Sequence, residues 1–385
     1  MANLPSFRSK LPAGGVSIFA VMTRLAQAHG AINLSQGFPD FETSPALIEA
    51  VARYMREGHN QYAPMPGVVA LREALAGKIE RLYGRRYDPV TGIAITTGAT
   101  EALFATLTAL VHPGDEVVLF QPAYDSYLPA IQLSGGVPRY VTLRYPDYRI
   151  DWDEVRAVVG PKTRVIVVNT PHNPTGMIWT PDDVRELGRV LEGTDAVVVS
   201  DEVYEHIRFD GAVHESLARH ADIAERAVVI SSFGKTYHTT GWKVGYCAAP
   251  APLITEILGV RQWMTFSVNG AVQMAYADAV ARDPLCDEVT AFYQGRRDRF
   301  RALVAGSRFQ LLPCRGTFFQ MLDYSAITDE PGVAFAARLT REHGVASIPI
   351  APFLQPGEDP GPVLRFCFAK RDATLEQAAE RLCRV

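Results

Sequence analysis

Five short, mainly apolar runs alternate with segments of helical spacing between about residues 70 and 250 of the chain. The runs cover residues 93–97, 116–120, 165–168, 196–199 and 227–230. Segments 100–111 and 181–191, which lie between runs, have helical spacing. Alternation of this kind is typical of β-α-β units. Runs that are apolar on both faces indicate strands covered by helices on both sides. The sequence therefore predicts an α/β fold with a mainly parallel sheet.

The pattern changes beyond about residue 285. A charged segment of helical spacing, 287–304, is followed by short strand-like runs and by a closing helix over 374–384. The strand-like runs cover residues 316–322, 346–349 and 363–368. A chain of 385 residues is long for a single core. We therefore expect a second, smaller α+β unit, which the residues before Gln36 could join, or they could wrap around a partner.

Composition excludes several classes of protein. The net charge of -4 includes no basic block, so neither nucleic acid nor an anionic membrane is an expected partner. The N-terminus lacks the apolar core of a signal peptide, and no stretch approaches the length of a membrane span. Five scattered cysteines form no Cys-x-x-Cys pair, which argues against a disulfide framework and against a zinc site. We therefore expect a soluble cytoplasmic protein without a metal.

Distinctive polar residues follow the first three apolar runs, at the sheet edge where open α/β folds bind ligands. Residues 97–100 begin a helix, whose free N–H groups could bind a phosphate or could form an ordinary helix cap. Tyr124 could stack on a flat ring or could pack in the core. Asn173 lies in a turn stiffened by two prolines and a glycine, which fixes its direction.

The last two runs end near Asp201 and Lys235. Asp201 would be partly desolvated and would need a cation, such as a protonated pyridine nitrogen, to stay ionised; it could instead cap a helix. Lys235 could form a Schiff base with pyridoxal 5'-phosphate (PLP), or it could be a solvated surface lysine. A P-loop would need a glycine at position 229, which is valine. Together these residues indicate a PLP site.

With these residues in these positions, the chain resembles the fold-type I PLP-dependent aminotransferases of classes I and II. Within them it is most similar to the kynurenine aminotransferase/glutamine transaminase K group, which includes bacterial methionine aminotransferases. The resemblance covers almost the whole chain. Its motifs are NLSQGFPD at 33–40, NQY at 60–62, NTPHNPTG at 169–176, SDEVY at 200–204, ISSFGKT at 230–236, TGWKVG at 240–245 and RFCF at 365–368.

The resemblance implies a large PLP-binding domain, residues 40–284, with a mainly parallel seven-stranded sheet between helices. Residues 1–39 and 285–385 would form the small domain. Lys235 would carry the cofactor and move the substrate proton, and Asp201 would keep the pyridine nitrogen protonated. Asn173 and Tyr204 would bind the ring oxygen, and Tyr124 would stack on the ring.

The resemblance also implies how the rest of the site is built. The phosphate would be held by Ala99, Thr100, Ser232 and Lys243, with Tyr62 of the partner subunit of a homodimer. Arg365 would bind the substrate carboxylate through a bidentate fork, helped by Gly37 and Asn173. The apolar side-chain pocket would be drawn from Ile18, Phe19, Tyr62, Tyr124, Phe266 and Phe353.

This sequence departs from many relatives at two places. His172 stands where relatives often have a second asparagine, and Gly98, Ala99 and Thr100 form a phosphate turn that carries a bulkier residue in some relatives. Because Asn173 is in place, we expect little change in the ring chemistry. The second departure leaves open whether Thr100 binds through its hydroxyl group or only through its N–H.

The expected reaction is ping-pong transamination between an L-amino acid of methionine, glutamine or aromatic type and a 2-oxo acid. A cysteine-conjugate or cystathionine β-lyase would use the same lysine, aspartate and phosphate site, and so it stays an alternative. A PLP-sensing transcription regulator would carry a basic DNA-binding domain ahead of the family motifs. These motifs begin by about residue 33, which argues against a regulator.

Overall fold

A computed structural model describes residues 9–11, 16–282 and 286–385. Residues 1–8, 12–15 and 283–285, which the predicted domain division includes, lie outside the described residues. The division into residues 40–284 and residues 1–39 with 285–385 stays a prediction.

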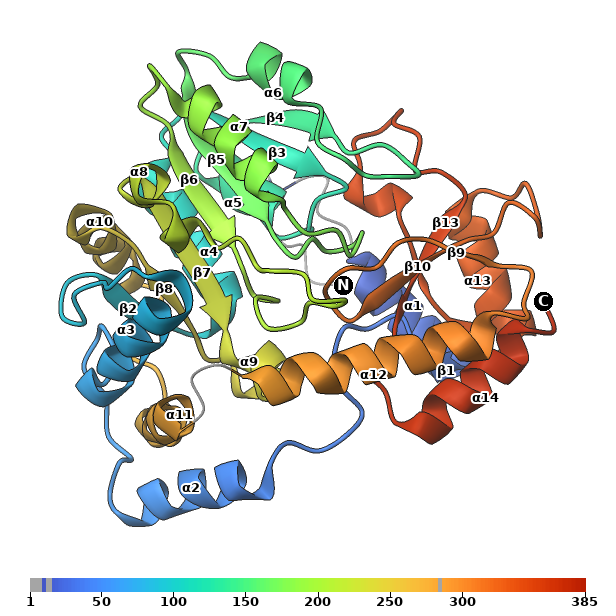
Figure 1. Ribbon diagram of the computed structural model, residues 1–385, viewed down its shortest axis with the longest axis horizontal. Coiled ribbons are helices and arrows are strands. Elements are labelled where there is room, and N and C mark those ends of the chain that lie inside the picture. Colours follow the sequence, from blue (N-terminus) through green and yellow to red (C-terminus); the bar gives the residue numbers. More distant parts are fainter. Residues whose placement is uncertain (1–8, 12–15, 283–285) are drawn as a thin grey trace, which may run out of the picture.

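A seven-stranded sheet in the order β2-β8-β7-β6-β5-β3-β4 forms the centre of the larger part of the molecule (Figure 1). Its strands are β2 (Ile93–Thr96), β3 (Glu116–Gln121), β4 (Val137–Thr142), β5 (Thr163–Asn169), β6 (Val197–Asp201), β7 (Ala227–Ser232) and β8 (Gly245–Ala248). Within this sheet β8 runs antiparallel to both neighbours, and the other neighbouring pairs are parallel. The predicted mainly parallel sheet is therefore confirmed.

Helices cover both faces of this sheet, as its apolar strands require. In β5, Val165 and Val167 pack into one core cluster, whereas Ile166 and Val168 pack into the other, because successive side chains point to opposite faces. One face is covered by α4 (Gly98–Leu110), α5 (Tyr127–Leu133) and α10 (Ala251–Arg261). The other is covered by α3 (Val69–Tyr83), α6 (Trp152–Val158), α7 (Pro181–Leu191), α8 (Ala221–Ala224) and α11 (Gly270–Arg282).

A four-stranded antiparallel sheet lies beside the large one, in the order β12-β13-β10-β9 (Figure 1). Its strands are β9 (Gln310–Leu311), β10 (Phe319–Asp323), β12 (Ile348–Pro349) and β13 (Val363–Cys367). Its region of the fold also contains α12 (Asp287–Val304), α13 (Gly332–Glu342) and α14 (Asp372–Leu382). The predicted strands and helices beyond residue 285 are therefore present, although their bounds shift by a few residues.

The described part of the N-terminal segment joins this smaller region. Strand β1 (Ile32–Asn33) pairs in parallel with β11 (Val345–Ala346), and α1 (Ile18–Ala28) packs against α13. Helix α2 (Pro45–Arg56) then crosses to the other region and packs against α11. The remaining short elements are α9 (Phe233–Thr236), η1 (Leu217–Arg219), η2 (Thr240–Trp242) and η3 (Ala351–Phe353).

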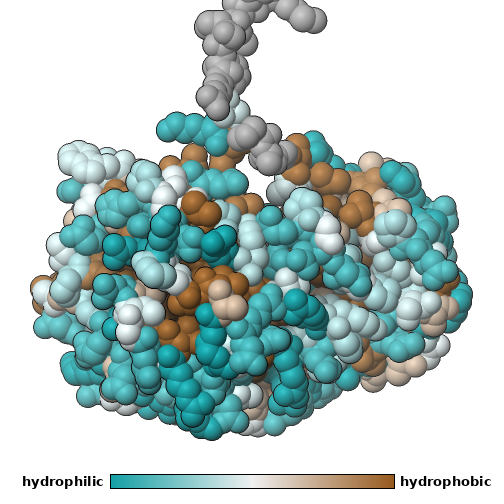
Figure 2. All heavy atoms as spheres, turned by 90° about the horizontal axis from the view of Figure 1, so that it is seen from above, coloured by the Kyte–Doolittle hydropathy of each residue, from teal (hydrophilic) through white to brown (hydrophobic). Residues whose placement is uncertain are grey.

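The surface is mixed in character. Figure 2 shows a face that is largely hydrophilic, with apolar residues gathered in patches near its middle. Across residues 9–11, 16–282 and 286–385, no helix is long and apolar enough to cross a membrane. The same residues contain no group of histidine, cysteine or acidic side chains that could hold a metal ion. The five cysteines, all within the described residues, form no disulfide; Cys383 is exposed and the other four are buried.

Candidate active site

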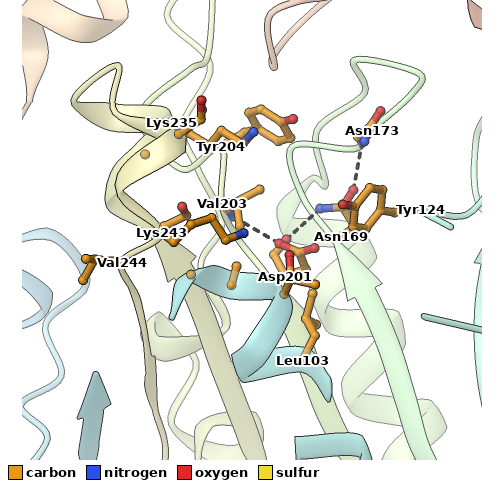
Figure 3. A pocket seen from close by; sticks show the side chains of 16 residues that line it. Leu103, Tyr124, Asn169, Asn173, Asp201, Val203, Tyr204, Lys235, Lys243 and Val244 are labelled. Carbon is orange, nitrogen blue, oxygen red and sulfur yellow. Dashed lines mark hydrogen bonds between the residues drawn. The ribbon is translucent and has the colours of Figure 1, made fainter. Parts of the chain in front are cut away.

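A cavity of about 230 Å³ lies at the carboxyl edge of the large sheet (Figure 3). Its walls come from the segments that follow β2, β3, β5, β6 and β7. The antiparallel direction of β8 brings the start of that strand to the same edge. Nine residues that the sequence singled out line this cavity together: Ala99, Thr100, Tyr124, Asn173, Asp201, Tyr204, Ser232, Lys235 and Lys243.

Asp201 is a buried carboxylate at the end of β6, with 4% of its surface exposed. Its Oδ2 accepts a hydrogen bond of 2.6 Å from Tyr127 Oη, and its Oδ1 accepts one of 3.3 Å from the Val203 N–H. Burial raises the pKa of Asp201 to about 6, because an ionised carboxylate loses its hydration there. A carboxylate held in this way fits a cationic group on its open side.

Lys235 lies on α9, directly after β7, and its side chain is half-buried at the cavity. Its Nζ donates to the Gly37 carbonyl at 3.4 Å and lies 5.9 Å from the centre of the Tyr204 ring. Burial lowers the pKa of Lys235 to about 8, so a large fraction of the amine is neutral near that pH. A neutral amine can act as a nucleophile or as a base.

Two residues that the sequence did not single out fix the geometry around Asp201. Asn169, at the end of β5, donates from Nδ2 to the Asp201 carbonyl at 2.8 Å and accepts from the Asn173 N–H at 2.8 Å (Figure 3). Tyr127, on α5, binds the Asp201 carboxylate directly. Tyr124 and Tyr127 lie in one turn, where the Tyr127 N–H donates to the Tyr124 carbonyl at 3.2 Å and the rings meet edge to face at 5.7 Å. Two tyrosines three residues apart after a strand are a signal that could have indicated this pair.

The start of α4 and the segment before β8 meet at one end of the cavity. Gly98 has a φ of +76°, and a Cβ there would lie 3.3 Å from Lys243 Nζ. A Cβ at Gly245 would lie 2.8 Å from the Ala99 backbone nitrogen, so the two segments are in close contact. The Ser232 hydroxyl does not cap α9. A helix N-terminus beside a lysine and a hydroxyl group fits a phosphate.

Arg365 lies on β13 with 1% of its surface exposed. Its Nη1 donates to Asn173 Oδ1 at 2.7 Å, and its Nη2 donates to the Ser35 carbonyl at 2.9 Å. Its Nε is buried and has no hydrogen-bond partner among the described residues. Burial lowers the pKa of Arg365 to about 10, which leaves it charged at neutral pH. A buried guanidinium with an unused donor fits a carboxylate.

Apolar side chains surround this arginine. The guanidinium carbon of Arg365 lies 5.3 Å from the Phe19 ring centre and 5.9 Å from the Phe353 ring centre. The two rings are 5.7 Å apart. Ile18 and Phe353 line a neighbouring cavity that shares Tyr124 with the first. At Gly37, a Cβ would come within 2.6 Å of a ring carbon of Phe319, so the close approach there favours glycine.

Two predicted pocket residues lie elsewhere in this chain. Tyr62 and Phe266 do not line the cavity; their rings meet edge to face at 5.5 Å. Tyr62 is 84% exposed and Phe266 is 47% exposed. The predicted roles of these two residues in the site stay predictions.

His172 is held within its own turn. Its Nδ1 lies 2.8 Å from Thr175 Oγ1, and burial lowers the pKa of the ring to about 4. The neutral ring lies outside the cavity that contains Asn173. The substitution at position 172 thus leaves the neighbouring amide free to contact Arg365.

Comparisons with known proteins identify the family. The model of the aminotransferases of class I and II matches residues 29–382. A methionine aminotransferase of Escherichia coli is 50% identical over 99% of both chains. A crystal structure from the same organism, reported with a methionine aminotransferase function, superposes with a TM-score of 0.96 at 49% identity, covering 99% of this chain and 100% of that one. A kynurenine–oxoglutarate transaminase of Dictyostelium discoideum is 33% identical, covering 96% of this chain and 94% of that protein. The chain therefore belongs to the class I and II aminotransferases, a family of PLP-dependent enzymes of fold type I.

Proposed function

We propose that this aminotransferase transfers the amino group of methionine, or of a similar large uncharged L-amino acid, to a 2-oxo acid. The observation that carries the proposal is the arrangement of Lys235, Asp201 and Arg365. The first two line one cavity, and Arg365 is bonded to Asn173 in its wall. The names of the similar proteins support methionine as a donor.

We infer that PLP binds in the cavity of about 230 Å³. Bound PLP supplies an electron-withdrawing ring that stabilises negative charge at the substrate α-carbon. Asp201 would keep the ring nitrogen protonated, and Tyr124 would cover one face of the ring. The phosphate would be held by Ala99, Thr100, Ser232 and Lys243. The raised pKa of Asp201 supports this assignment, since a cationic partner would relieve the cost of burying its charge.

Asn173 and Tyr204 would bind the ring oxygen of PLP. Arg365 uses the Oδ1 of Asn173, which orients the amide and leaves its Nδ2 to donate. Tyr204 is buried, and its ring packs edge-on against Phe318 at 5.2 Å, so its direction is fixed. The same hydrogen bond therefore links the residue proposed for the substrate carboxylate to a residue proposed for the cofactor.

Lys235 would move the proton at the substrate α-carbon. A base for this step must lie within hydrogen-bond reach of the carbon and must be neutral when it accepts the proton. The lowered pKa of Lys235 supports that role. Arg365 would hold the α-carboxylate through its unused Nε and one Nη group, with help from Gly37.

The substrate side chain would lie against Ile18, Phe19 and Phe353. Asp125 is half-buried in the neighbouring cavity. Burial raises its pKa, and the positive charge of Arg365 partly opposes that shift. A carboxylate beside an apolar wall disfavours a second negative charge on the substrate. We therefore expect methionine to be used better than aspartate.

We also infer a homodimer in which Tyr62 of the partner subunit completes the phosphate site. Large apolar side chains are exposed near the loop before α11. They include Tyr62 and Trp263, each 84% exposed, with Met264 at 40% and Phe266 at 47%. Several large apolar side chains exposed close together are typical of a protein–protein interface.

The absorbance spectrum of the PLP-loaded protein tests the function. Adding L-methionine is expected to convert the visible band of bound PLP to that of the aminated cofactor, and adding a 2-oxo acid should restore it. We expect kcat/KM for methionine to exceed that for aspartate by at least about tenfold, the scale of discrimination by an apolar pocket. A higher kcat/KM for aspartate would overturn the proposed specificity, and a spectrum that no amino acid changes would overturn the reaction.

Replacing Asp201 with asparagine is expected to weaken PLP binding about 10- to 100-fold above pH 6, because a charge-assisted hydrogen bond to the ring nitrogen is lost. In the wild type, affinity should fall as the pH drops through about 6, since protonation removes the charge of Asp201. In Asp201→Asn the part of this pH dependence that comes from Asp201 should be lost, which leaves only the part due to the PLP phosphate and Lys235. Titrations of the cofactor-free protein with PLP between pH 5 and 8 measure both effects. Equal affinity and equal pH dependence in the two proteins would contradict the assigned role.

A further inference from the structure

The loop that carries Phe353 belongs to the small sheet but is tied to the large one. It contains η3 and follows β12, in which Ile348 pairs with Arg365 of β13. Across the site, the end of β3 provides Gln121 and, two residues later, Ala123. The loop therefore spans from the arginine side of the site to the cofactor side.

Two hydrogen bonds tie this loop to β3. The Ala123 N–H donates to the Phe353 carbonyl at 2.8 Å. The Gln355 N–H donates to Gln121 Oε1 at 2.9 Å. Gln121 is 1% exposed, so the second bond is shielded from water. Both partners of the loop lie within four residues of Tyr124, which lines the main cavity.

A second hydrogen bond, to the neighbouring strand, fixes the side chain of Gln121. Its Nε2 donates to Thr142 Oγ1 on the neighbouring β4 at 3.0 Å. Because the amide nitrogen is used in this way, the oxygen points to the loop and is available to Gln355. The amide group of Gln121 thus connects β4 to the loop through two hydrogen bonds. Gln121 does not line the main cavity.

The Gln121 bond acts two residues beyond Phe353 and adds to the Ala123 bond in holding that residue. The ring is 5% exposed and packs near Phe19 and the Arg365 guanidinium. After Gln355 the chain enters the exposed segment 356–359, so the Gln121 bond lies at the boundary between the buried and the exposed part of the loop. Losing it would leave Phe353 next to a loosened segment, and that segment would have to be ordered each time a substrate side chain is bound.

We propose that Gln121 is a positioning residue for specificity, which selects large apolar substrates by holding Phe353 in place beside Arg365. The inference rests on the proposed function, in which Arg365 binds the α-carboxylate and Phe353 contacts the substrate side chain. Methionine gains from a Phe353 ring that is already ordered. Alanine gains little, because its methyl group is too short to cover the ring. The ratio of kcat/KM for methionine to that for alanine therefore reports the effect of the hydrogen bond between Gln355 and Gln121.

Gln121→Met removes the acceptor and should lower this ratio about three- to tenfold, the effect of one buried hydrogen bond. Gln355→Pro removes the donor from the other side without changing β3, and it should lower the ratio by a similar factor. Gln355→Ala keeps the N–H and serves as the matched control, with the wild-type ratio expected. Combining Gln121→Met with Gln355→Pro should lower the ratio no further than either change alone.

Hydrogen exchange of the backbone amides of residues 351–361 gives a readout independent of turnover. Exchange should be faster in Gln121→Met than in the wild type, whereas Gln355→Ala, which keeps the N–H that donates to Gln121, should show the slow exchange of the wild type. Provided that the wild type turns over methionine, either of two results in Gln121→Met would overturn the proposal. One is an equal loss of kcat/KM for methionine and alanine, and the other is hydrogen exchange as slow as in the wild type. If the wild type turns over neither amino acid, the proposed function fails and the specificity role fails with it.

Discussion

Replacing Lys235 with alanine is expected to lower kcat/KM for transamination by about 10⁴-fold, the upper range for loss of a general acid–base group. Lys235 lines the cavity beside Gly37 and Tyr204, and its lowered pKa of about 8 keeps much of the amine neutral. Single-turnover absorbance measurements with L-methionine isolate the proton-transfer step. Lys162→Ala is the matched control, because Lys162 is exposed and does not line the cavity, and it should retain wild-type turnover.

The lowered pKa of Lys235 also predicts how the stability of the cofactor-free protein changes with pH. Its pKa falls from 10.5 in the unfolded chain to about 8 in the folded protein. Between these values the unfolded state binds the extra proton, so the stability of the cofactor-free protein should rise with pH from about 8 to 10.5. In Lys235→Met this rise should be smaller, and the variant should be more stable than the wild type at pH 7. Urea unfolding of both proteins across this range would reveal identical slopes if the amine were fully hydrated.

The sequence predicted the central strands well because their burial leaves a strong local signal. Strand β5 is apolar on both faces, and its residues divide between two cores. By contrast, β4 (Val137–Thr142) was missed because it lies at the sheet edge and alternates exposed residues with half-buried ones over its first four positions, so only its last two residues are buried. Strand β8 was missed because its sequence, GYCA at Gly245–Ala248, has no β-branched residue, whereas the equally short β2 reads IAIT. Both omissions concern segments whose conformation is set by pairing with distant strands.

The site was predictable where a residue's chemistry follows from its place after a strand. Lys235, Asp201 and Asn173 follow the ends of three strands, and the structure brings them to one edge. Asn169 and Gln121 could not be recognised in this way. Each acts through a partner on another segment, and the sequence alone does not say which strands are neighbours or which side-chain atoms meet. The supporting residues of the site therefore became visible only with the three-dimensional arrangement.

A buried polar network supports the turn that carries Asp201 and Tyr204. Glu205 accepts hydrogen bonds from Lys78 Nζ at 2.7 Å, Tyr83 Oη at 2.6 Å and Ser231 Oγ at 2.7 Å. The side chains of Lys78 and Glu205 are only 7% and 3% exposed. One carboxylate thus links α3, the segment after β6 and the end of β7, behind the wall of the cavity.

Lys78→Met is expected to lower the free energy of unfolding by about 3–5 kcal/mol, the cost of leaving one member of a buried ion pair uncompensated. Burial alone would lower the pKa of Lys78, but the Glu205 carboxylate raises it overall, and Lys78 in turn holds the pKa of Glu205 well below its usual range. Both groups are therefore charged at neutral pH. Urea unfolding of the cofactor-free protein at pH 7 measures the loss, which is among the largest expected for a single substitution.

The double variant Lys78→Met with Glu205→Gln separates the charge from the hydrogen bonds. Tyr83 and Ser231 donate to different oxygens of Glu205. The single oxygen of glutamine can accept one of these bonds, and its NH2 group can donate to the other hydroxyl. Because no unpaired charge is left, most of the lost stability should return. Lys162→Met provides the control for an exposed lysine and should change stability by less than about 0.5 kcal/mol. If Lys78→Met costs no more than that control, the pair contributes nothing to the fold. If the double variant is as unstable as Lys78→Met, packing of the lysine stem rather than its charge supports the wall behind Asp201 and Tyr204.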